Sequence, residues 1–211
     1  FRSRIMEIKI CGMTRLENIL EVDRLGPDYL GFIFYKGSKR FYHAAENLPH
    51  GLTAQKVGVF VDQDLEEVLS MVDRHGLNVI QLHGSECVEY CVELKAKRDV
   101  KIWKMIAVSS VDDLAAGKAY VGTVDRLLFE TKSRDFGGSG TSFNWELLSS
   151  LGYHCEFMVA GGLGLHNLDQ VRALSGSLPG FKGLDFNSKL ETEPGVKSVD
   201  RVRELMEYVR A

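Results

Sequence analysis

KVGVFVDQDLEEVLSMVDRHGLNVIQLHG, residues 56–84, is the clearest strand–helix–strand pattern in the chain. Residues 56–61 form a short run rich in β-branched and aromatic side chains, which is typical of a buried strand. Residues 65–75 repeat apolar side chains every three or four positions, as an amphipathic helix does, and residues 79–82 form a second apolar run. Two strands connected through a helix predict a parallel β–α–β unit.

The same alternation extends along the whole chain. Strands are expected at residues 7–10, 29–34, 56–61, 79–82, 101–106, 126–129, 157–160 and 183–186. Helices are expected at 16–25, 43–48, 65–75, 87–97, 111–118, 145–151, 168–174 and 199–209. Eight such pairs predict a single-domain α/β fold, a (β/α)8 TIM barrel over residues 5–211, with residues 1–4 as an N-terminal extension of uncertain origin. A doubly wound sheet is the alternative, but no G-x-G-x-x-G follows the first strand.

The composition is that of a globular chain that folds without cross-links. Apolar residues make up 45% and charged residues 26%, which is ordinary for a soluble domain. The net charge of −3 and the lack of a long Lys or Arg run argue against nucleic-acid binding. Four irregularly spaced cysteines favour a reducing compartment over a disulfide framework. No apolar segment reaches the roughly 18 residues of a membrane span, so we expect a cytoplasmic protein without a membrane partner.

Polar or reactive side chains follow the predicted strands, at the end where barrels of this kind hold their active sites. They are Cys11, Gln81, His83, Glu130 and Asp185. Residues two apart on a strand share a face, so Lys9 and Cys11 point the same way. If that face is the barrel interior, Cys11, Glu130 and Asp185 converge on one mouth as candidate acid–base groups.

Several motifs together resemble those of the phosphoribosylanthranilate isomerases. The most specific are K-I-C-G-M-T-R at residues 9–15 and L-G-F-I-F-Y-K-G-S-K-R at 30–40. The others follow in the family's order: V-G-V-F-V at 57–61, Q-L-H-G at 81–84, E-T at 130–131, G-G-S-G at 137–140, F-N-W at 143–145, G-G-L at 161–163 and L-D-F-N-S-K-L-E-T-E-P-G at 184–195. Each motif alone is weak, but their order and spacing extend the resemblance over residues 7–210.

The resemblance implies an isomerase of tryptophan biosynthesis that performs an Amadori rearrangement on a small-molecule substrate, phosphoribosylanthranilate. Cys11 matches the family's general base, and Lys9 would favour its thiolate form. Glu130 stands where the family has an aspartate as general acid. Its extra methylene moves the carboxyl group by roughly 1.5 Å unless the side chain folds back, and such shifts affect rate strongly. The chemistry needs no metal and no cofactor, and the family resemblance is compatible with a monomer or a homodimer.

The resemblance also implies the residues that bind the substrate. Arg40 and Asp185 match the residues that engage the anthranilate moiety, since a guanidinium binds a carboxylate bidentately. Gln81 and His83 are candidates for positioning the substrate, although a histidine at a strand end is often structural. Loops after the last three strands are expected to hold the phosphate through backbone N–H groups. The phosphate-binding candidates are Gly138, Ser139, Gly161, Gly162, Asn187 and Ser188.

Two other functions remain open from the sequence. The related phosphoribosyl aminoaldose isomerase of histidine biosynthesis performs the same rearrangement, but it is expected to carry aspartate at the end of the first strand, so Cys11 argues against it. A catalytically impaired barrel that only binds a phosphate ligand is the other alternative, and Glu130 is the reason to consider it. A fluorescence assay for loss of phosphoribosylanthranilate separates these possibilities.

Overall fold

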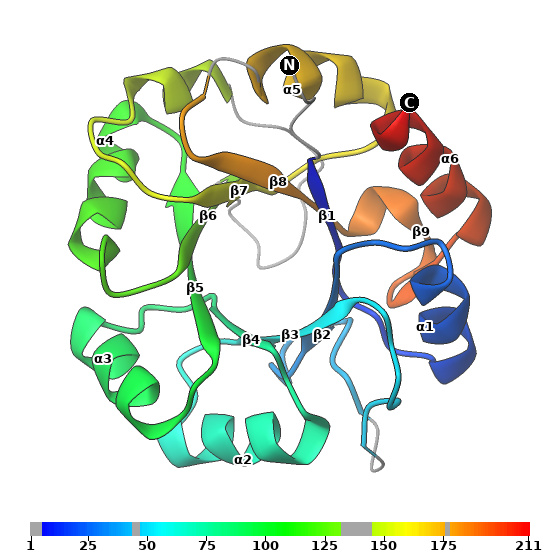
Figure 1. Ribbon diagram of the computed structural model, residues 1–211, viewed down its shortest axis with the longest axis horizontal. Helices are drawn as coiled ribbons and strands as arrows, with labels where there is room; N and C mark the ends of the chain where they lie inside the picture. Colours follow the sequence, from blue (N-terminus) through cyan, green and yellow to red (C-terminus); the bar gives the residue numbers. More distant parts are fainter. Residues whose placement is uncertain (1–5, 44–46, 132–144, 176–177) are drawn as a thin grey trace.

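Eight parallel strands close into a barrel in the computed structural model, which describes residues 6–43, 47–131, 145–175 and 178–211 (Figure 1). The strands are β1 (Glu7–Ile10), β2 (Tyr29–Ile33), β3 (Gln55–Phe60), β4 (Val79–Leu82), β5 (Lys101–Val108), β6 (Arg126–Thr131), β7 (Phe157–Val159) and β8 (Phe181–Phe186). Each strand pairs with the next one in the chain, and β8 returns to pair with β1. The predicted (β/α)8 barrel is confirmed, and its closure leaves none of these strands as an open edge.

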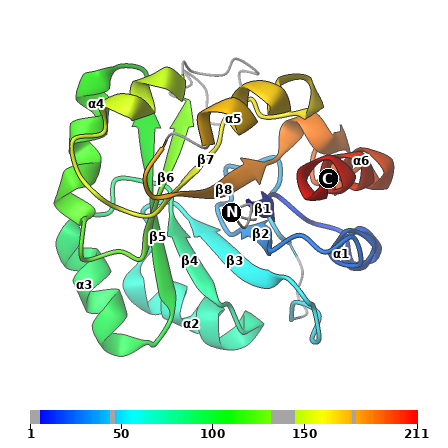
Figure 2. The ribbon, with the colours of Figure 1, turned by 45° about the horizontal axis from the view of Figure 1, so that its top comes forward.

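The helices surround the ring of strands (Figures 1 and 2). They are α1 (Leu16–Asp23), α2 (Leu65–His75), α3 (Val88–Lys97), α4 (Val111–Ala115), α5 (Leu168–Ser175) and α6 (Val199–Arg210). Short 3-10 helices are η1 (Ala116–Tyr120), η2 (Trp145–Ser150), η3 (Leu165–Asn167) and η4 (Ser188–Leu190). A two-stranded hairpin, β9 (Glu191–Glu193) and β10 (Val196–Lys197), follows η4 and was not expected from the sequence.

The helix predicted at residues 43–48 is wrong for the residues that the structure describes. His43, Asn47 and Leu48 are not helical, and residues 44–46 lie outside the described part of the chain. Six residues are too few to offset the cost of nucleating a helix without tertiary support. Leu48 is buried instead as a single side chain, and its backbone N–H donates to Nδ1 of His75 at 3.3 Å.

Helix α2 shows how local sequence sets the bounds of an element. The side chain of Asp64 accepts a hydrogen bond from the backbone N–H of Glu66 at 2.9 Å and so caps the first turn. Gly76 ends the helix with φ of 58°, a left-handed conformation that glycine adopts without steric cost. The predicted bounds of this helix, 65–75, are therefore confirmed.

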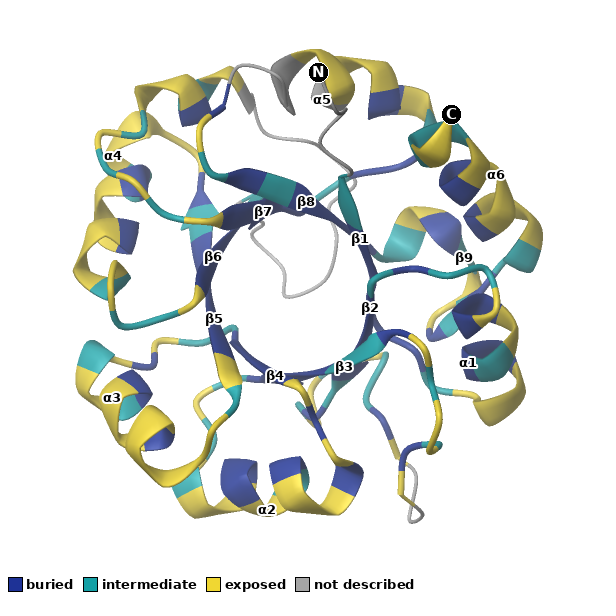
Figure 3. Ribbon diagram, in the orientation of Figure 1, coloured by how far each residue is buried: buried dark blue, intermediate teal, exposed yellow. Residues whose placement is uncertain are grey.

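The strands send alternate side chains to two separate apolar clusters. Residues such as Ile8, Phe32 and Phe129 point outward and pack in the core beneath the helices. A smaller cluster fills the barrel itself with one or two side chains from most strands: Tyr29, Val57, Val79, Trp103, Leu128, Met158 and Ala160. In Figure 3 the strands are mostly buried, whereas the helices alternate between buried and exposed residues. Because Leu128 lies inside the barrel, Glu130 two residues later does so too.

Within the described residues, no helix is both long enough and apolar enough to cross a membrane.

Candidate active site

Barrel closure brings Lys9 and Asp185 side by side at the centre of the mouth. They are opposite each other in the β1–β8 register, so both point into the barrel. Nζ of Lys9 lies 2.6 Å from Oδ2 of Asp185, and both side chains are buried. The other oxygen, Oδ1 of Asp185, is buried and has no hydrogen-bond partner among the described residues. An unsatisfied buried acceptor costs about 1–3 kcal/mol, so this atom is a candidate acceptor for a ligand N–H.

Cys11 follows β1 directly, and its side chain is only 5% exposed. Gly31 on the neighbouring strand makes room for it, because a Cβ at that position would lie 2.7 Å from Sγ of Cys11. Burial raises the pKa of the Cys11 thiol, and the charge of Lys9 opposes that shift without cancelling it. The expectation that Lys9 favours the thiolate is correct in direction. It does not overcome the cost of burying a charged sulfur.

His83 connects Gln81 to Glu130 across the mouth. Nε2 of Gln81 donates to Nδ1 of His83 at 3.1 Å, so the neutral imidazole carries its proton on Nε2. That nitrogen lies 3.3 Å from Oε2 of Glu130. Burial lowers the pKa of His83 to about 4, assisted by the charge of Lys9, and the ring is therefore neutral near pH 7. The three predicted residues thus form one chain of polar contacts, and Oε1 of Gln81 is a buried acceptor without a partner among the described residues.

Glu130 is partly exposed, and its pKa is raised. About 30% of its side chain is exposed at the mouth, while the rest is enclosed by the barrel wall. Burial raises the pKa of Glu130 above its ordinary value, and the charge of Lys9 only partly opposes this. A raised pKa keeps more of the carboxyl group protonated, as a general acid requires.

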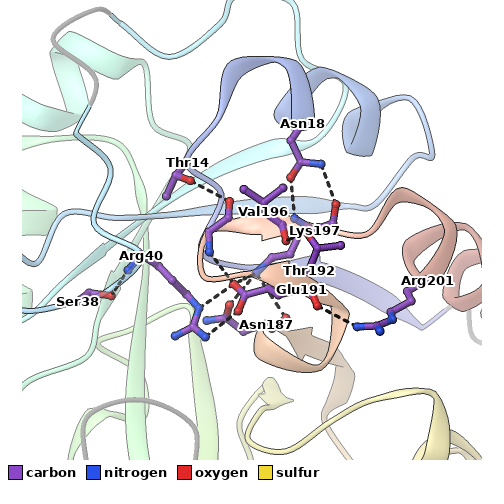
Figure 4. A network of polar contacts seen from close by, with 11 residues as sticks. Thr14, Asn18, Ser38, Arg40, Asn187, Glu191, Thr192, Val196, Lys197 and Arg201 are labelled. Atoms are coloured by element: carbon purple, nitrogen blue, oxygen red, sulfur yellow. Dashed lines mark hydrogen bonds and ion pairs between the residues drawn. The ribbon is translucent and has the colours of Figure 1, made fainter.

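Arg40 lies in the loop after β2 and is bound by a carboxylate that sequence reasoning did not single out. Its Nε and Nη2 donate to Oε1 and Oε2 of Glu191, both at 2.7 Å (Figure 4). The backbone N–H of Arg40 also donates to Oγ of Ser38 at 3.1 Å. The predicted ligand-binding arginine is therefore held in place by a fork-to-fork ion pair. Glu191 is the first of the two glutamates in the last motif, at residues 184–195, but nothing in the sequence indicated that its partner is Arg40.

Lys197 is the other functional candidate that the sequence did not indicate. It lies in β10, is fully buried, and its Nζ donates to Oδ1 of Asn187 and to Oε1 of Glu191, each at 2.7 Å. Asn187, predicted to bind phosphate, thus directs its side-chain oxygen toward Lys197. Its Oδ1 would also lie 2.8 Å from a Cβ at Gly12. The side chain of Asn187 therefore lies between Lys197 and the backbone of Gly12, the residue after Cys11.

The loops after β7 and β8 lie next to each other at the mouth, and the loop after β8 includes Asn187. Gly161 and Gly162 have φ of 87° and 67°, a left-handed conformation that glycine adopts readily. A Cβ at Gly164 would come within 3.0 Å of Cβ of Lys189, next to Ser188. Ser188 begins η4, where the first N–H groups of a helix lack partners within the helix. The other two phosphate candidates, Gly138 and Ser139, lie outside the described residues.

Among the described residues, no three His, Cys, Asp or Glu side chains are grouped so that they could hold a metal ion. The chemistry available at the mouth is that of a thiol, two carboxyl groups, a neutral imidazole and buried cations.

Comparison with known proteins identifies relatives that share this architecture. A family model described as N-(5'phosphoribosyl)anthranilate (PRA) isomerase matches residues 8–208. The N-(5'-phosphoribosyl)anthranilate isomerase of Parabacteroides distasonis is 34% identical over 209 residues, covering 97% of this chain and 93% of the relative. The phosphoribosyl anthranilate isomerase structure from Thermus thermophilus superposes with a TM-score of 0.82 at 31% identity, covering 97% and 98% of the two chains. A phosphoribosyl anthranilate isomerase in complex with reduced 1-(o-carboxyphenylamino)-1-deoxyribulose 5-phosphate superposes with a TM-score of 0.77 at 28% identity and the same coverage.

Proposed function

The chain belongs to the N-(5'-phosphoribosyl)anthranilate isomerase family, and from this premise we propose that it converts N-(5'-phosphoribosyl)anthranilate into 1-(2-carboxyphenylamino)-1-deoxyribulose 5-phosphate. The reaction is an Amadori rearrangement in tryptophan biosynthesis. The observation that carries the assignment to this site is the convergence of a thiol and a carboxyl group of raised pKa on one barrel mouth.

Glu130 is the general acid of the first step. Its proton moves to the ribose ring oxygen, the bond from that oxygen to C1′ breaks, and the amine lone pair forms a protonated Schiff base. Nε2 of His83, which carries the ring proton, lies 3.3 Å from Oε2 of Glu130, so the acidic proton is assigned to Oε1, where it is free to be transferred. The same contact orients the longer glutamate side chain, which is how this chain would accommodate the additional methylene.

Cys11 is the general base of the second step. Its thiolate takes the proton from C2′, the C–H electrons form a double bond between C1′ and C2′, and the electrons of the C=N bond return to nitrogen. The resulting enolamine tautomerises to the ketose. Because burial raises the pKa of Cys11, the thiolate depends on nearby cations, of which Lys9 contributes most.

The substrate's own groups match the unsatisfied atoms of the mouth. The amino N–H of the anthranilate moiety is a donor suited to Oδ1 of Asp185, and its carboxylate is an acceptor suited to Arg40. The phosphate is assigned to the backbone N–H groups near Gly162 and Ser188, in the loops after β7 and β8. This arrangement would hold both ends of the substrate and leave C1′ and C2′ between Glu130 and Cys11.

A fluorescence assay with the intact chain tests the proposal. Phosphoribosylanthranilate is fluorescent, and the purified protein should remove its signal in a time-dependent reaction that saturates with substrate. Binding of the reduced product analogue without any turnover of the substrate would leave a ligand-binding barrel and overturn the proposed activity.

Two expectations about the cellular context belong to the same proposal. The described cysteines are all free, which suits a reducing cytoplasm where the Cys11 thiol is preserved. Whether the protein is a monomer or a homodimer stays a prediction, and light scattering on the purified protein measures it.

A further inference from the structure

The Glu191 cluster, defined as Arg40, Asn187, Glu191 and Lys197, is a network of polar contacts (Figure 4). Its members come from the loop after β2, the end of β8 and the β9–β10 hairpin. The side chains of Glu191 and Lys197 are 6% and 0% exposed, and that of Arg40 is 14% exposed. A Cβ at Gly12 would lie 2.7 Å from Cδ of Arg40, so the cluster is packed directly against the segment that carries the proposed base.

The geometry at Arg40 leaves one edge of its guanidinium unused. Glu191 takes the side edge, which is formed by Nε and Nη2. A guanidinium has five N–H groups, so three remain, two on Nη1 and one on Nη2. Within the described residues, Nη1 makes no hydrogen bond. The end edge of Arg40 can therefore bind a second carboxylate bidentately while the first one stays in place.

Lys197 and Arg40 both bind Glu191 and so fix its position from two sides. All three contacts of Lys197 Nζ are acceptors, namely Oδ1 and the carbonyl oxygen of Asn187 and Oε1 of Glu191, which is the arrangement an ammonium group requires. Burial raises the pKa of Glu191, but the bonds and charges of Arg40 and Lys197 outweigh burial and bring it below its ordinary value. Burial lowers the pKa of Lys197, and the charge of Glu191 only partly opposes that shift. The bonds to Glu191 raise the pKa of Arg40, so its guanidinium stays charged and remains suited to a carboxylate.

The hairpin holds the cluster in a fixed position. The backbone N–H and carbonyl of Lys197 are both bonded to the side-chain amide of Asn18, at 2.8 and 2.9 Å. Oε1 of Glu191 additionally accepts from the backbone N–H of Gly195 at 3.0 Å. Gly195 is in turn bonded through its carbonyl to Oγ of Thr14 at 2.9 Å. Glu191 therefore has several partners besides Arg40 that would have to be given up if it swung away.

We propose that Glu191 and Lys197 are positioning residues for substrate recognition: Lys197 holds Glu191, and Glu191 holds the side edge of Arg40 and so directs its free end edge at the carboxylate of the substrate. The inference rests on the proposed function. Neither residue touches the substrate, and both act through Arg40.

The test compares two ligands on the intact protein by calorimetry. One is reduced 1-(o-carboxyphenylamino)-1-deoxyribulose 5-phosphate, and the other is the same compound without the ring carboxylate. Glu191→Gln should weaken the first ligand roughly tenfold or more and change the second by less than about threefold. Kinetically, KM should rise while kcat changes little. If Glu191→Gln bound the carboxylated ligand as tightly as the wild type does, or more tightly, the proposal would be overturned. Tighter binding would mean that Glu191 competes with the substrate for Arg40.

Matched variants separate positioning from general effects. Glu193→Gln removes the same charge from the same hairpin, but Glu193 is 54% exposed and pairs with Arg15, so affinity should stay within about twofold. Lys197→Met should weaken the carboxylated ligand selectively, as Glu191→Gln does. In an Arg40→Met background, Glu191→Gln should have no further effect on either ligand; an undiminished effect would contradict action through Arg40.

Two safeguards keep the outcome interpretable. If Glu191→Gln unfolds the protein, Glu191→Asp is the alternative variant. It keeps the charge, but its side chain is one methylene shorter and does not reach Arg40 as closely, so the affinity for the carboxylated ligand should fall by an intermediate amount. If the wild type neither turns over phosphoribosylanthranilate nor distinguishes the two ligands, the proposed function itself fails. If the wild type does both and the variants keep the distinction, only the positioning inference fails.

Discussion

The two ends of the barrel differ in how their charged and polar side chains are paired. At the amino end, Arg126 contacts Glu7 at 2.5 Å and Glu156 at 3.3 Å, and Glu156 also pairs with Lys182 at 2.7 Å. The guanidinium of Arg126 lies 5.0 Å from the ring centre of Trp103. Two cations balance two carboxylates there, and the aromatic face covers the remaining surface.

At this amino end one buried atom, Nε of Arg126, lacks a hydrogen-bond partner within the described residues. At the carboxyl end two buried acceptors, Oε1 of Gln81 and Oδ1 of Asp185, lack one, and the Cys11 thiol and the part-exposed Glu130 carboxyl group both have raised pKa values. Such features cost stability, and they persist where a ligand supplies what is missing. The comparison teaches that the two ends differ in the acidity of their groups rather than in the number of charged residues: burial raises the pKa values of Cys11 and Glu130 at the carboxyl end, whereas cations outweigh burial and lower that of Glu156 at the amino end.

The largest expected effect is on catalysis at the carboxyl end. Cys11→Ser should lower kcat by at least about a hundredfold, because a hydroxyl does not ionise near neutral pH. The melting temperature and the affinity for the reduced product analogue should change little, since the substitution is nearly isosteric. Steady-state kinetics and calorimetry measure the two quantities. More than about a tenth of wild-type kcat remaining would remove Cys11 from the role of general base.

Glu130 gives the next largest effect and the sharpest check on the family departure. Glu130→Gln should lower kcat by roughly a hundredfold, whereas Glu130→Asp should retain or increase it, because aspartate restores the family's usual acid. A nearly inactive wild type that Glu130→Asp rescues would favour the impaired-barrel alternative. A wild type of ordinary activity with an equally active Glu130→Gln variant would contradict the role of Glu130.

Arg126 tests the amino end, where the expected effect is on stability alone. Arg126→Met removes the ion-pair partner of Glu7 and should lower the free energy of unfolding by about 1 kcal/mol, since the carboxylate of Glu7, which is 29% exposed, loses its donor but stays partly hydrated. The kcat of the folded protein should stay within about threefold of the wild type. Urea unfolding followed by activity measurement at low temperature gives both values. A large loss of kcat in folded Arg126→Met would contradict the expectation that the amino end contributes to stability and not to catalysis.

The smallest effect is a difference in pH dependence between two glutamates. At the amino end, burial raises the pKa of Glu156, but Lys182 and Arg126 outweigh burial and bring it below its ordinary value. The stability it contributes is therefore present above its unfolded pKa and lost as pH falls. Burial raises the pKa of Glu130, so its ionisation costs stability as pH rises through the folded pKa.

The measurement is thermal unfolding of two variants between pH 4 and pH 7. Relative to the wild type at pH 7, Glu130→Gln should raise the melting temperature slightly and Glu156→Gln should lower it slightly. Both differences should shrink toward pH 4. Because Glu156 is about half exposed, its effect should be the weaker of the two. Shifts of the same sign at pH 7 would remove the electrostatic distinction between the two ends.

Local patterns were sufficient to predict the architecture, and the roles proposed for Cys11 and Glu130 came from the family resemblance. Apolar periodicity predicted all eight strands, with bounds that differ by no more than two residues at either end. Strand alternation and the polarity of parallel strands then predicted that Cys11, Glu130 and Asp185 would share one mouth. The 43–48 helix shows the limit of such patterns, because a short weakly periodic segment takes its conformation from its surroundings.

The partners of those groups came only from the closed barrel. Asp185 is 176 residues from Lys9, and Glu191 is 151 residues from Arg40, and they meet because β8 returns to β1 and carries the hairpin with it. No spacing along the chain indicates that Lys197 faces Asn187, or that Gly31 leaves space for Cys11. Periodicity depends on a residue's near neighbours in the chain, whereas charge balance, burial and the resulting pKa directions depend on whatever tertiary contacts surround a group. The sequence was therefore enough to propose Glu130 as acid and Cys11 as base, and the tertiary structure decided which charges act on them.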